Sequence, residues 1–278
     1  MGDGTRERNL AATQDFYARG LRVAMEPVWG EHLHLGLFER PEEPLRAAQE
    51  RAVAAMADGL PLTPGSRVLE VACGLGPAAR HLARRYGCRV LASNISERQL
   101  GQGRALTRDA GLADRVAFLG ADFHSLPFAD AGFDLWWCQE SLLHSPDKAA
   151  VLREARRMLG PEGWLALSDV TVPHWVGADD RTAIYARVRS PGMWDRADYD
   201  RALDALGFEV VRFEDWSRHV APSYAAIRAA AARHLERHAV DLPADDCGHA
   251  LAQFQLWVDA AEAGKIGWHY YCARARDG

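Results

Sequence analysis

The sequence predicts an α/β fold, a doubly wound and mostly parallel sheet of seven strands with helices on both faces. Two observations lead to this prediction. From residue 67 onward, short β-rich apolar runs alternate with stretches of helical periodicity, as expected for parallel strands joined by crossover helices. The chain also has 278 residues, of which 48% are hydrophobic, enough to bury a full core.

The elements follow in order along the chain. Helical spacing over residues 11–25 and 44–60 predicts a helical cover or lid over residues 1–62, before the sheet domain at 63–278. The predicted strands are 67–72, 89–93, 116–119, 133–138, 164–170, 208–213 and 267–273. Helices are expected at 78–86, 97–110, 148–159, 222–239 and 250–263. Helical insertions are placed at about 174–205 and 220–263, and the last two helices belong to the second of these.

Composition excludes several function classes. The formal net charge of −5 disfavours nucleic acid and anionic membrane surfaces, which require a basic face. Five cysteines without a Cys-x-x-Cys pair favour reduced thiols in the cytoplasm over disulfides or zinc, and no metal site is predicted. The first ten residues are polar, and no apolar run approaches the ~20 residues of a membrane span.

The strongest local motif is the segment 68–76, Val-Leu-Glu-Val-Ala-Cys-Gly-Leu-Gly, between a predicted strand and a predicted helix. Glycines in such a loop let a ligand approach the backbone, and the helix N-terminus offers free N–H groups. Ala79 and Arg80 stand where a dinucleotide-binding motif has a third glycine. Together with the acidic Glu70, this favours a ligand with an ammonium and a carboxylate group over a diphosphate. A tight turn without a ligand is the alternative.

The next strand ends supply further polar groups. Asn94, assisted by Gln99, is placed to bind ribose hydroxyls. Asp122 can accept a hydrogen bond from an adenine amino group while the backbone N–H of Phe123 donates to the ring, although Asp122 is equally a residue type that caps helices and turns. The fourth strand ends at Gln139, at the sheet edge where ligands of open α/β sheets bind.

Together these features resemble the class I S-adenosylmethionine-dependent methyltransferases, which have a Rossmann-like sheet. Residues 29–36, Trp-Gly-Glu-His-Leu-His-Leu-Gly, are similar to a segment of sarcosine/dimethylglycine N-methyltransferases and tocopherol C-methyltransferase-like enzymes. Residues 139–145 and the tail around 257–268 look closest to the sarcosine/dimethylglycine type. Pro77 departs from the glycine or alanine common at its position, and Glu70 from a frequent aspartate.

The resemblance implies S-adenosyl-L-methionine as cofactor and S-adenosyl-L-homocysteine as product. It also implies an N-terminal helix folded over the cofactor, with Tyr17 near the methionine end. The predicted cofactor-binding residues are Tyr17, Trp29, Glu70, Cys73, Gly74, Gly76, Asn94, Ile95, Gln99, Asp122, Phe123, Gln139 and His144.

Methyl transfer from a sulfonium requires alignment and exclusion of water, and a base where the acceptor carries a proton. The predicted catalytic residues are His144, as the candidate base, with Glu140 and Tyr17. Packing or cofactor contact remains an open alternative for His144. For Glu140 the alternatives are helix capping and pairing with a substrate cation or with His144.

The predicted substrate-side residues are His32, His34, Trp175 and Trp194. The two histidines alternate, so an extended segment directs both to one side; a metal pair is the weaker interpretation. Aromatic side chains there attract methylammonium groups, but they line an apolar pocket equally well.

The sequence therefore predicts an enzyme that methylates a small molecule, with an amine nitrogen favoured. A C- or O-methyltransferase acting on a prenylated, aromatic or other natural-product acceptor is the alternative. A non-methylating S-adenosylmethionine enzyme and a non-catalytic cofactor-binding protein are further hypotheses. The oligomeric state, monomer or homodimer, is left open.

Overall fold

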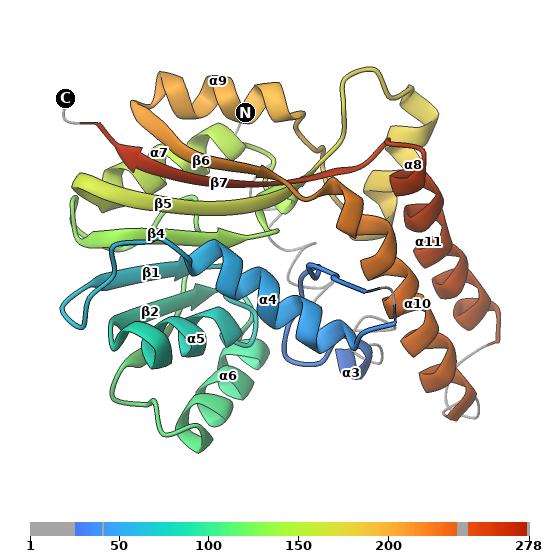
Figure 1. Ribbon diagram of the computed structural model, residues 1–278, viewed down its shortest axis with the longest axis horizontal. Helices are drawn as coiled ribbons and strands as arrows, with labels where there is room; N and C mark the ends of the chain where they lie inside the picture. The colour runs from blue at the N-terminus through green and yellow to red at the C-terminus, as the bar shows by residue number, and fades with distance from the viewer. Residues whose placement is uncertain (1–25, 41, 238–243, 277–278) are drawn as a thin grey trace.

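A computed structural model describes residues 26–40, 42–237 and 244–276 (Figure 1). Seven strands form one sheet in the order β3-β2-β1-β4-β5-β7-β6. The strands are β1 Arg67–Val71, β2 Arg89–Asn94, β3 Val116–Gly120, β4 Phe133–Gln139, β5 Leu159–Thr171, β6 Phe208–Asp215 and β7 Gly267–Ala275. Strands β1 to β5 pair in parallel, whereas β7 runs antiparallel to β5 and β6. The predicted fold class is confirmed.

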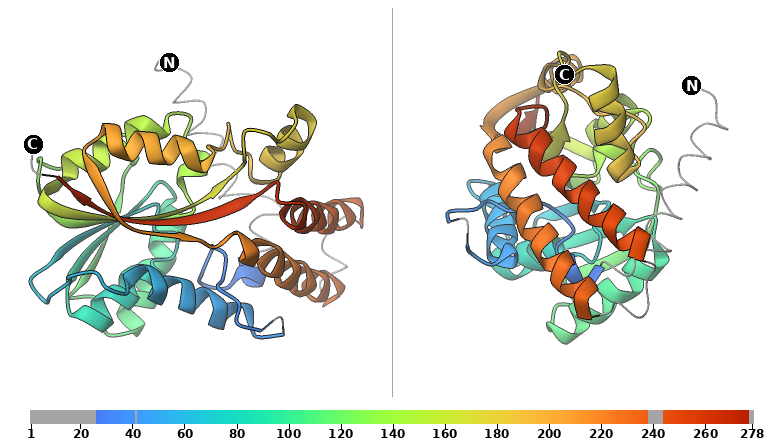
Figure 2. Two further views of the ribbon diagram at one scale, coloured as in Figure 1. Left: turned by 45° about the horizontal axis from the view of Figure 1, so that its top comes forward. Right: turned by 90° about the vertical axis from the view of Figure 1, so that its right-hand side faces the viewer.

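Helices cover both faces of this sheet (Figures 1 and 2). On one face lie α4 (Leu45–Ala57), α5 (Pro77–Tyr86) and α6 (Glu97–Asp109), and on the other lie α7 (Lys148–Met158) and α9 (Arg196–Ala205). The strand order reverses between β1 and β4, so the chain leaves these neighbouring strands toward opposite faces. A crevice at the carboxyl ends of the two strands is the usual ligand site of such sheets.

The remaining helices gather at one end of the sheet. They are α3 (Glu26–Trp29), α8 (Ala178–Val188), α10 (Val220–Arg237) and α11 (Ala244–Glu262), with the short 3-10 helices η1 (Leu142–His144) and η2 (Ser217–His219). Helices α10 and α11 lie side by side (Figure 2). The rings of Tyr224 and Trp257 join them at a centroid distance of 4.6 Å, and the Trp257 indole donates to the Ile184 carbonyl of α8 at 3.1 Å.

Alternation along the central strands builds a core on each side of the sheet. Val68 and Trp137 belong to one hydrophobic cluster, and their neighbours Leu69 and Trp136 belong to the other. All four side chains are fully buried, as expected for strands of a parallel sheet covered on both faces. Burying each such large side chain contributes about 1.5–3 kcal/mol.

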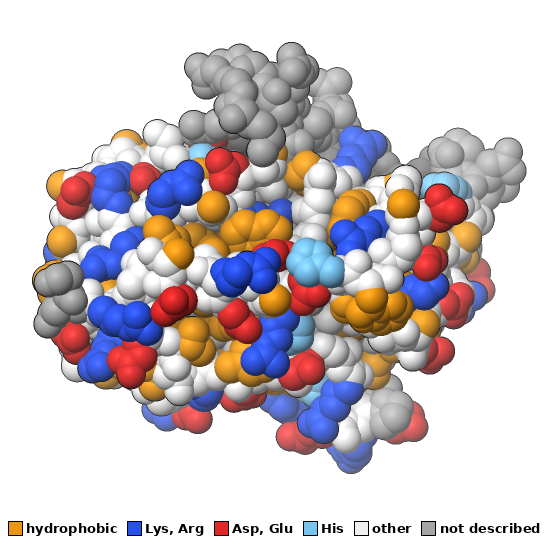
Figure 3. Space-filling model, turned by 90° about the horizontal axis from the view of Figure 1, so that it is seen from above, with side chains coloured by type: hydrophobic (Ala, Val, Ile, Leu, Met, Phe, Trp, Pro, Cys, Tyr) orange, Lys and Arg blue, Asp and Glu red, His pale blue; other side chains and the backbone are white. Residues whose placement is uncertain are grey.

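The surface carries mixed charge. On the face shown in Figure 3, basic and acidic side chains are interspersed, and the described residues of that face form no extended area of one sign. Among the described helices, none combines the length and the apolar character that crossing a bilayer requires.

Candidate functional site

A cavity at the carboxyl edge of β1, β2 and β4 encloses about 880 Å³ of space between protein atoms, part of it open to solvent. The cavity is lined by Glu31, Leu33, His34, Glu70, Val71, Ala72, Cys73, Gly74, Leu75, Pro77, Ala78, Asn94, Ile95, Gln99, Ala121, Phe123, Gln139, Glu140, Ser141 and His144.

The loop after β1 forms the floor of this first cavity. Gly74 has φ +56°, and a Cβ there would meet only the flexible end of Leu33. Gly76 has φ +72°, and a Cβ there would lie 2.7 Å from the Phe118 ring. Gly76 therefore lets the loop pack on β3, while Gly74 is the glycine exposed to the cavity. Pro77 begins α5 at a position where its missing N–H costs nothing.

Besides Glu140 Oε1, three buried polar atoms of residues that line the cavity have no hydrogen-bond partner in the described part of the chain. They are Glu70 Oε2, Gln99 Nε2 and Gln139 Nε2. Buried polar groups are normally paired, so these atoms can bind a ligand in the cavity. One carboxylate oxygen and two amide donors fit a ligand with an ammonium, a carboxylate and hydroxyl groups.

The surroundings of these groups set the protonation of Glu70 and the position of the Gln99 amide. Burial raises the pKa of Glu70 to about 8, and the Arg80 guanidinium opposes this rise. A bound ammonium group would act in the same direction as Arg80 and favour the carboxylate. Asn94 donates to Gln99 Oε1 at 2.9 Å and accepts from the Ile95 N–H at 2.8 Å. These bonds hold both amides at the end of β2.

A second cavity, enclosing about 500 Å³, adjoins the first. Leu33, Glu140 and His144 line both cavities. The second cavity is otherwise lined by Trp29, Leu35, Leu143, Val170, Arg187, Val188, Tyr224 and Trp257. Its wall is therefore mainly aromatic and aliphatic. Arg187 adds a positive charge to this wall and does not border the first cavity.

Glu140 occupies the junction of the two cavities. Its backbone has φ +48°, a conformation that L-residues adopt at a cost and that is frequent at functional sites. One carboxylate oxygen accepts from the Leu35 N–H at 2.8 Å. The other, Oε1, is buried and makes no hydrogen bond of ordinary geometry with any described residue, although the Trp268 indole lies near. Burial raises the pKa of Glu140 to about 8, and the Leu35 N–H opposes the rise.

The two histidines of the 29–36 segment form a neutral pair. Their rings lie 5.0 Å apart, with His32 Nδ1 3.0 Å from His34 Nε2. His34 Nδ1 lies 2.8 Å from the Leu35 carbonyl, which can only accept, so His34 Nδ1 is the donor of this bond. In the neutral His34 ring Nε2 is then an acceptor, and His32 Nδ1 donates to it. Burial lowers the pKa of His32 to about 4 and of His34 to about 3. Within the described residues, no group of three metal-ligating side chains is arranged to hold a metal ion.

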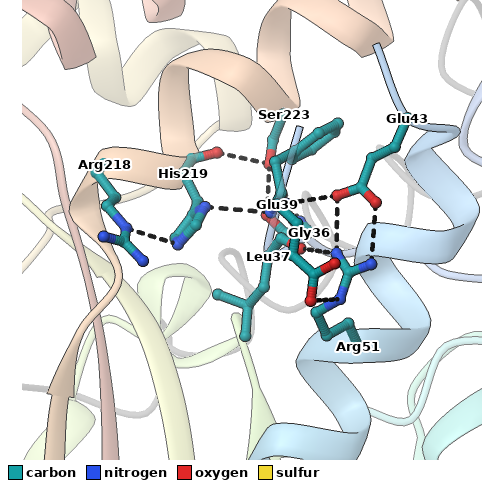
Figure 4. A network of polar contacts seen from close by, with 9 residues as sticks. Gly36, Leu37, Glu39, Glu43, Arg51, Arg218, His219 and Ser223 are labelled. Atoms are coloured by element: carbon teal, nitrogen blue, oxygen red, sulfur yellow. Dashed lines mark hydrogen bonds and ion pairs between the residues drawn. The ribbon is translucent and has the colours of Figure 1, made fainter. Parts of the chain in front are cut away.

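The segment that carries these histidines is fastened to η2 and α10 (Figure 4). Ser223 Oγ accepts from the Gly36 N–H at 3.1 Å and donates to the His219 carbonyl at 2.7 Å. The Phe38 N–H donates to His219 Nδ1 at 3.1 Å. A Cβ on Gly36 would lie 2.6 Å from that of Ala48, so only glycine allows the segment to lie this close to α4.

On its other side the same segment is fastened to α4 by Arg51 (Figure 4). The guanidinium donates to the Leu37 carbonyl and forms two bonds with Glu43, at 2.7 and 2.9 Å. Glu43 Oε1 also accepts from the Glu39 N–H at 2.6 Å. The cover of the cavities is thus held from both flanks by bonds that no local sequence pattern predicts.

The turn that carries His144 is also held in place. Lys148, which is buried, donates to the Ser145 carbonyl at 3.0 Å and to the Gly192 carbonyl at 2.5 Å. Asp169, at the end of β5, accepts from the Tyr199 hydroxyl. Burial lowers the pKa of Lys148 to about 8, and the nearby Asp169 opposes this shift.

Most predicted cofactor residues meet at the first cavity, with four exceptions. Gly76 faces Phe118 of β3 and does not line the cavity. The Asp122 side chain is directed toward His124, although the adjacent Ala121 and Phe123 line the cavity. Trp29 borders the second cavity instead of the first. Tyr17 lies outside the described residues.

Three of the four predicted substrate residues, His32, Trp175 and Trp194, line neither cavity. Trp175 follows β5 at the surface and is 66% exposed. Trp194 packs against Tyr199 of α9, on the opposite face of the sheet, at a ring distance of 5.0 Å. Of the histidines, His34 lines the first cavity, and His32 lies behind it.

Sequence reasoning missed several residues of the second cavity and its cover. Arg187, Tyr224 and Trp257 come from three separate helices, and their spacing along the chain gives no signal. Arg80 is buried and forms an ion pair with Glu31 at 2.7 Å, which ties the cover to the loop after β1. Arg80 lies in α5 and also donates to the Leu75 carbonyl of that loop at 2.6 Å. Its position, where a dinucleotide-binding motif has a third glycine, is the only sequence signal for this role.

Comparisons with known proteins agree with this geometry. Residues 69–167 match the methyltransferase domain family. A sarcosine/dimethylglycine N-methyltransferase from Halorhodospira halochloris is 34% identical over 262 residues, 89% of each chain. A longer glycine/sarcosine/dimethylglycine N-methyltransferase from Actinopolyspora halophila is 31% identical, and the match covers 89% of this chain but 44% of that protein.

The acceptors named for similar proteins are not all amines. The 27-O-demethylrifamycin SV methyltransferase from Amycolatopsis mediterranei is 35% identical over 76% of this chain and 82% of its own length. Among solved structures, a putative sarcosine dimethylglycine methyltransferase from Galdieria sulphuraria superimposes with a TM-score of 0.82 at 25% identity, covering 90% of this chain and 96% of that one. With its sheet order, its cavity and these relatives, the chain belongs to the S-adenosylmethionine-dependent methyltransferases and is an enzyme with that cofactor.

Proposed function

We propose that the enzyme methylates the amine nitrogen of a small acceptor that also carries an anionic group, bound in the second cavity. The observation that carries this proposal is the wall of that cavity. It places a buried carboxyl group, Glu140, at the junction with the first cavity and a guanidinium, Arg187, beyond it. Trp29, Tyr224 and Trp257 supply aromatic surface near both.

The cofactor residues have defined tasks in this proposal. Glu70 receives the ammonium group, Asn94 and Gln99 receive the ribose hydroxyls, and the N–H groups at the start of α5 face the carboxylate. When bound, the cofactor supplies a sulfonium methyl group that a nucleophile can accept directly. The described residues between 26 and 62 act as the cover that excludes water.

On the acceptor side, Glu140 has two tasks. Its carboxylate pairs with the acceptor ammonium, whose positive charge favours the ionised form that burial alone disfavours. It then holds the proton that the nitrogen must lose before it can attack. A protonated tertiary amine needs both tasks as well, because its nitrogen has no free lone pair until the proton has left. Aromatic faces further stabilise methylammonium groups by about 0.5–2 kcal/mol.

Arg187 fits the anionic end of the acceptor. Its guanidinium stacks over the Phe254 ring at 4.5 Å, which fixes its orientation while it borders the cavity. A guanidinium binds a carboxylate through two parallel hydrogen bonds, which Lys cannot reproduce. The names of the Halorhodospira and Actinopolyspora relatives support an amino-acid acceptor of this kind.

Oxygen methylation is the second candidate, because the aliphatic and aromatic wall also suits an apolar acceptor. In that case His144, which borders both cavities, takes the proton from a hydroxyl group. The name of the Amycolatopsis relative supports this alternative.

The test is methyl transfer from labelled S-adenosylmethionine to two acceptor pools. One pool contains N-methylated amino acids, and the other contains phenols and isoprenoid alcohols. We expect label and S-adenosylhomocysteine in equal amounts with the first pool. Transfer to the second pool alone would overturn the amine proposal in favour of oxygen or carbon.

A further inference from the structure

His124 links the cofactor side of the site to the turn that carries His144. Its Nδ1 lies 2.7 Å from Asp122 Oδ1, and its Nε2 lies 2.8 Å from Ser145 Oγ. The same Asp122 oxygen accepts from the His124 backbone N–H at 3.0 Å. The side chains of His124 and Asp122 are only 9% and 15% exposed, and Ser145 is buried.

The chemistry of the three groups determines where the protons lie. A carboxylate only accepts, so His124 Nδ1 carries a proton and donates it to Asp122. In the neutral ring Nε2 then accepts, and the Ser145 hydroxyl donates to it. Ser145 Oγ in turn accepts from the Asp147 N–H at 3.0 Å. In the series of hydrogen bonds from the Asp147 N–H through Ser145 and His124 to Asp122, each N–H or O–H group therefore donates to one acceptor.

Ser145 is held through its backbone as well as its side chain. Its carbonyl accepts from Lys148, while its hydroxyl bonds to His124. His144 directly precedes it and borders both cavities. On the other side, Asp122 lies between Ala121 and Phe123, which line the first cavity where β3 ends. A single imidazole thus spans the two loops.

We propose that His124 is a positioning residue that orients the Asp122 carboxylate toward the adenine amino group and couples this contact to the turn 141–147. The proposal rests on the adenine role of Asp122. It is independent of the acceptor. One carboxylate oxygen is used by His124, so rotation of the side chain is restricted and the second oxygen has a defined direction.

The first test measures recognition of the adenine amino group in the full chain. S-adenosylhomocysteine and its purine-riboside analogue, in which hydrogen replaces that amino group and the ring nitrogens are unchanged, are titrated by calorimetry. We expect the wild type to prefer the adenosyl compound by about 10-fold or more, because the analogue has no amino group to donate to the Asp122 carboxylate. In His124→Ala this preference should fall below about 3-fold.

His124→Asn is the matched control, because its amide N–H can still donate to Asp122, and it should keep most of the preference. Equal preference in His124→Ala and the wild type would overturn the positioning role. No preference in the wild type would instead refute the adenine role of Asp122, so the two failures are distinguishable.

The second test follows the coupling by amide hydrogen exchange. S-adenosylhomocysteine should slow exchange of residues 141–147 in the wild type. In Ser145→Ala, which keeps the Asp122–His124 contact, the compound should still bind but slow exchange in this turn clearly less than in the wild type, because only the direct contacts of Ser141 and His144 with the cavity remain. Equal slowing in both proteins would overturn the coupling.

Discussion

The two cavities that meet at Glu140 are built in different ways. The first is lined largely by residues at the ends of β1, β2, β3 and β4 and in the turns that directly follow them. The second combines residues from the segment 29–35, β5, α8, α10 and α11, which lie far apart in the sequence. The first cavity binds the same cofactor in every member of the family, and the ends of the strands hold its residues in fixed positions. The residues of the second cavity lie mainly on helices late in the chain, where substitutions can change the acceptor that is bound without disturbing the sheet.

The largest expected effect comes from the residue that belongs to both cavities. Glu140→Gln keeps an acceptor for the Leu35 N–H but removes the charge, so kcat/KM for the acceptor should fall by about 10²-fold or more. At saturating cofactor, the wild type should gain activity as the pH rises through about 8, because the required form of Glu140 is the carboxylate.

The control is the pH profile of Glu140→Gln with the same acceptor, in which this rise should be absent and only the ionisation of the acceptor should remain. Unchanged kcat/KM in this variant would show that Glu140 serves only to hold Leu35. The two cavities would then lack a common catalytic group.

A change confined to the first cavity should affect only the cofactor. Glu70→Gln removes the carboxylate expected to pair with the ammonium group, and the loss of such a charged bond costs about 1.5–3 kcal/mol, or roughly 10- to 100-fold in affinity. Calorimetric titration with S-adenosylhomocysteine measures this effect. Glu70→Asp keeps the charge and should lose much less affinity; similar losses in both variants would argue against an ionic contact.

A change confined to the second cavity should affect only the acceptor. Arg187→Met should raise the acceptor KM by about 10-fold through the lost charged bond, while affinity for S-adenosylhomocysteine stays within about 2-fold. Arg187→Lys should recover part of the loss, because it retains the charge without the planar guanidinium. If the acceptor KM is insensitive to both substitutions, the anionic group of the acceptor is not bound here.

The smallest effect is expected outside both cavities. Trp175 is 66% exposed, so Trp175→Ala should change cofactor affinity and turnover by less than about 2-fold. Trp257→Ala, at a buried tryptophan of the second cavity, should lower acceptor turnover strongly and serves as the contrast. A strong effect of Trp175→Ala would mean that the acceptor reaches beyond the second cavity.

The sequence by itself determined the sheet, the loop after β1 and most of the first cavity. This was possible because alternation of strands and helices predicts a parallel sheet, and the ends of parallel strands meet at one edge. Glu70, Gly74, Asn94 and Gln99 could therefore be placed together from their positions alone. Glu140 was found by the same reasoning, as the first residue after β4.

Only the tertiary structure decided which residues form the second cavity. Trp29 and Trp257 line it, whereas Trp175 and Trp194 do not, and all four are tryptophans in segments near the sheet. Helix packing directs each side chain to one face, and that direction depends on contacts with distant elements. The same holds for the His124 link, because its partners Asp122 and Ser145 approach each other only when the loops after β3 and β4 fold together.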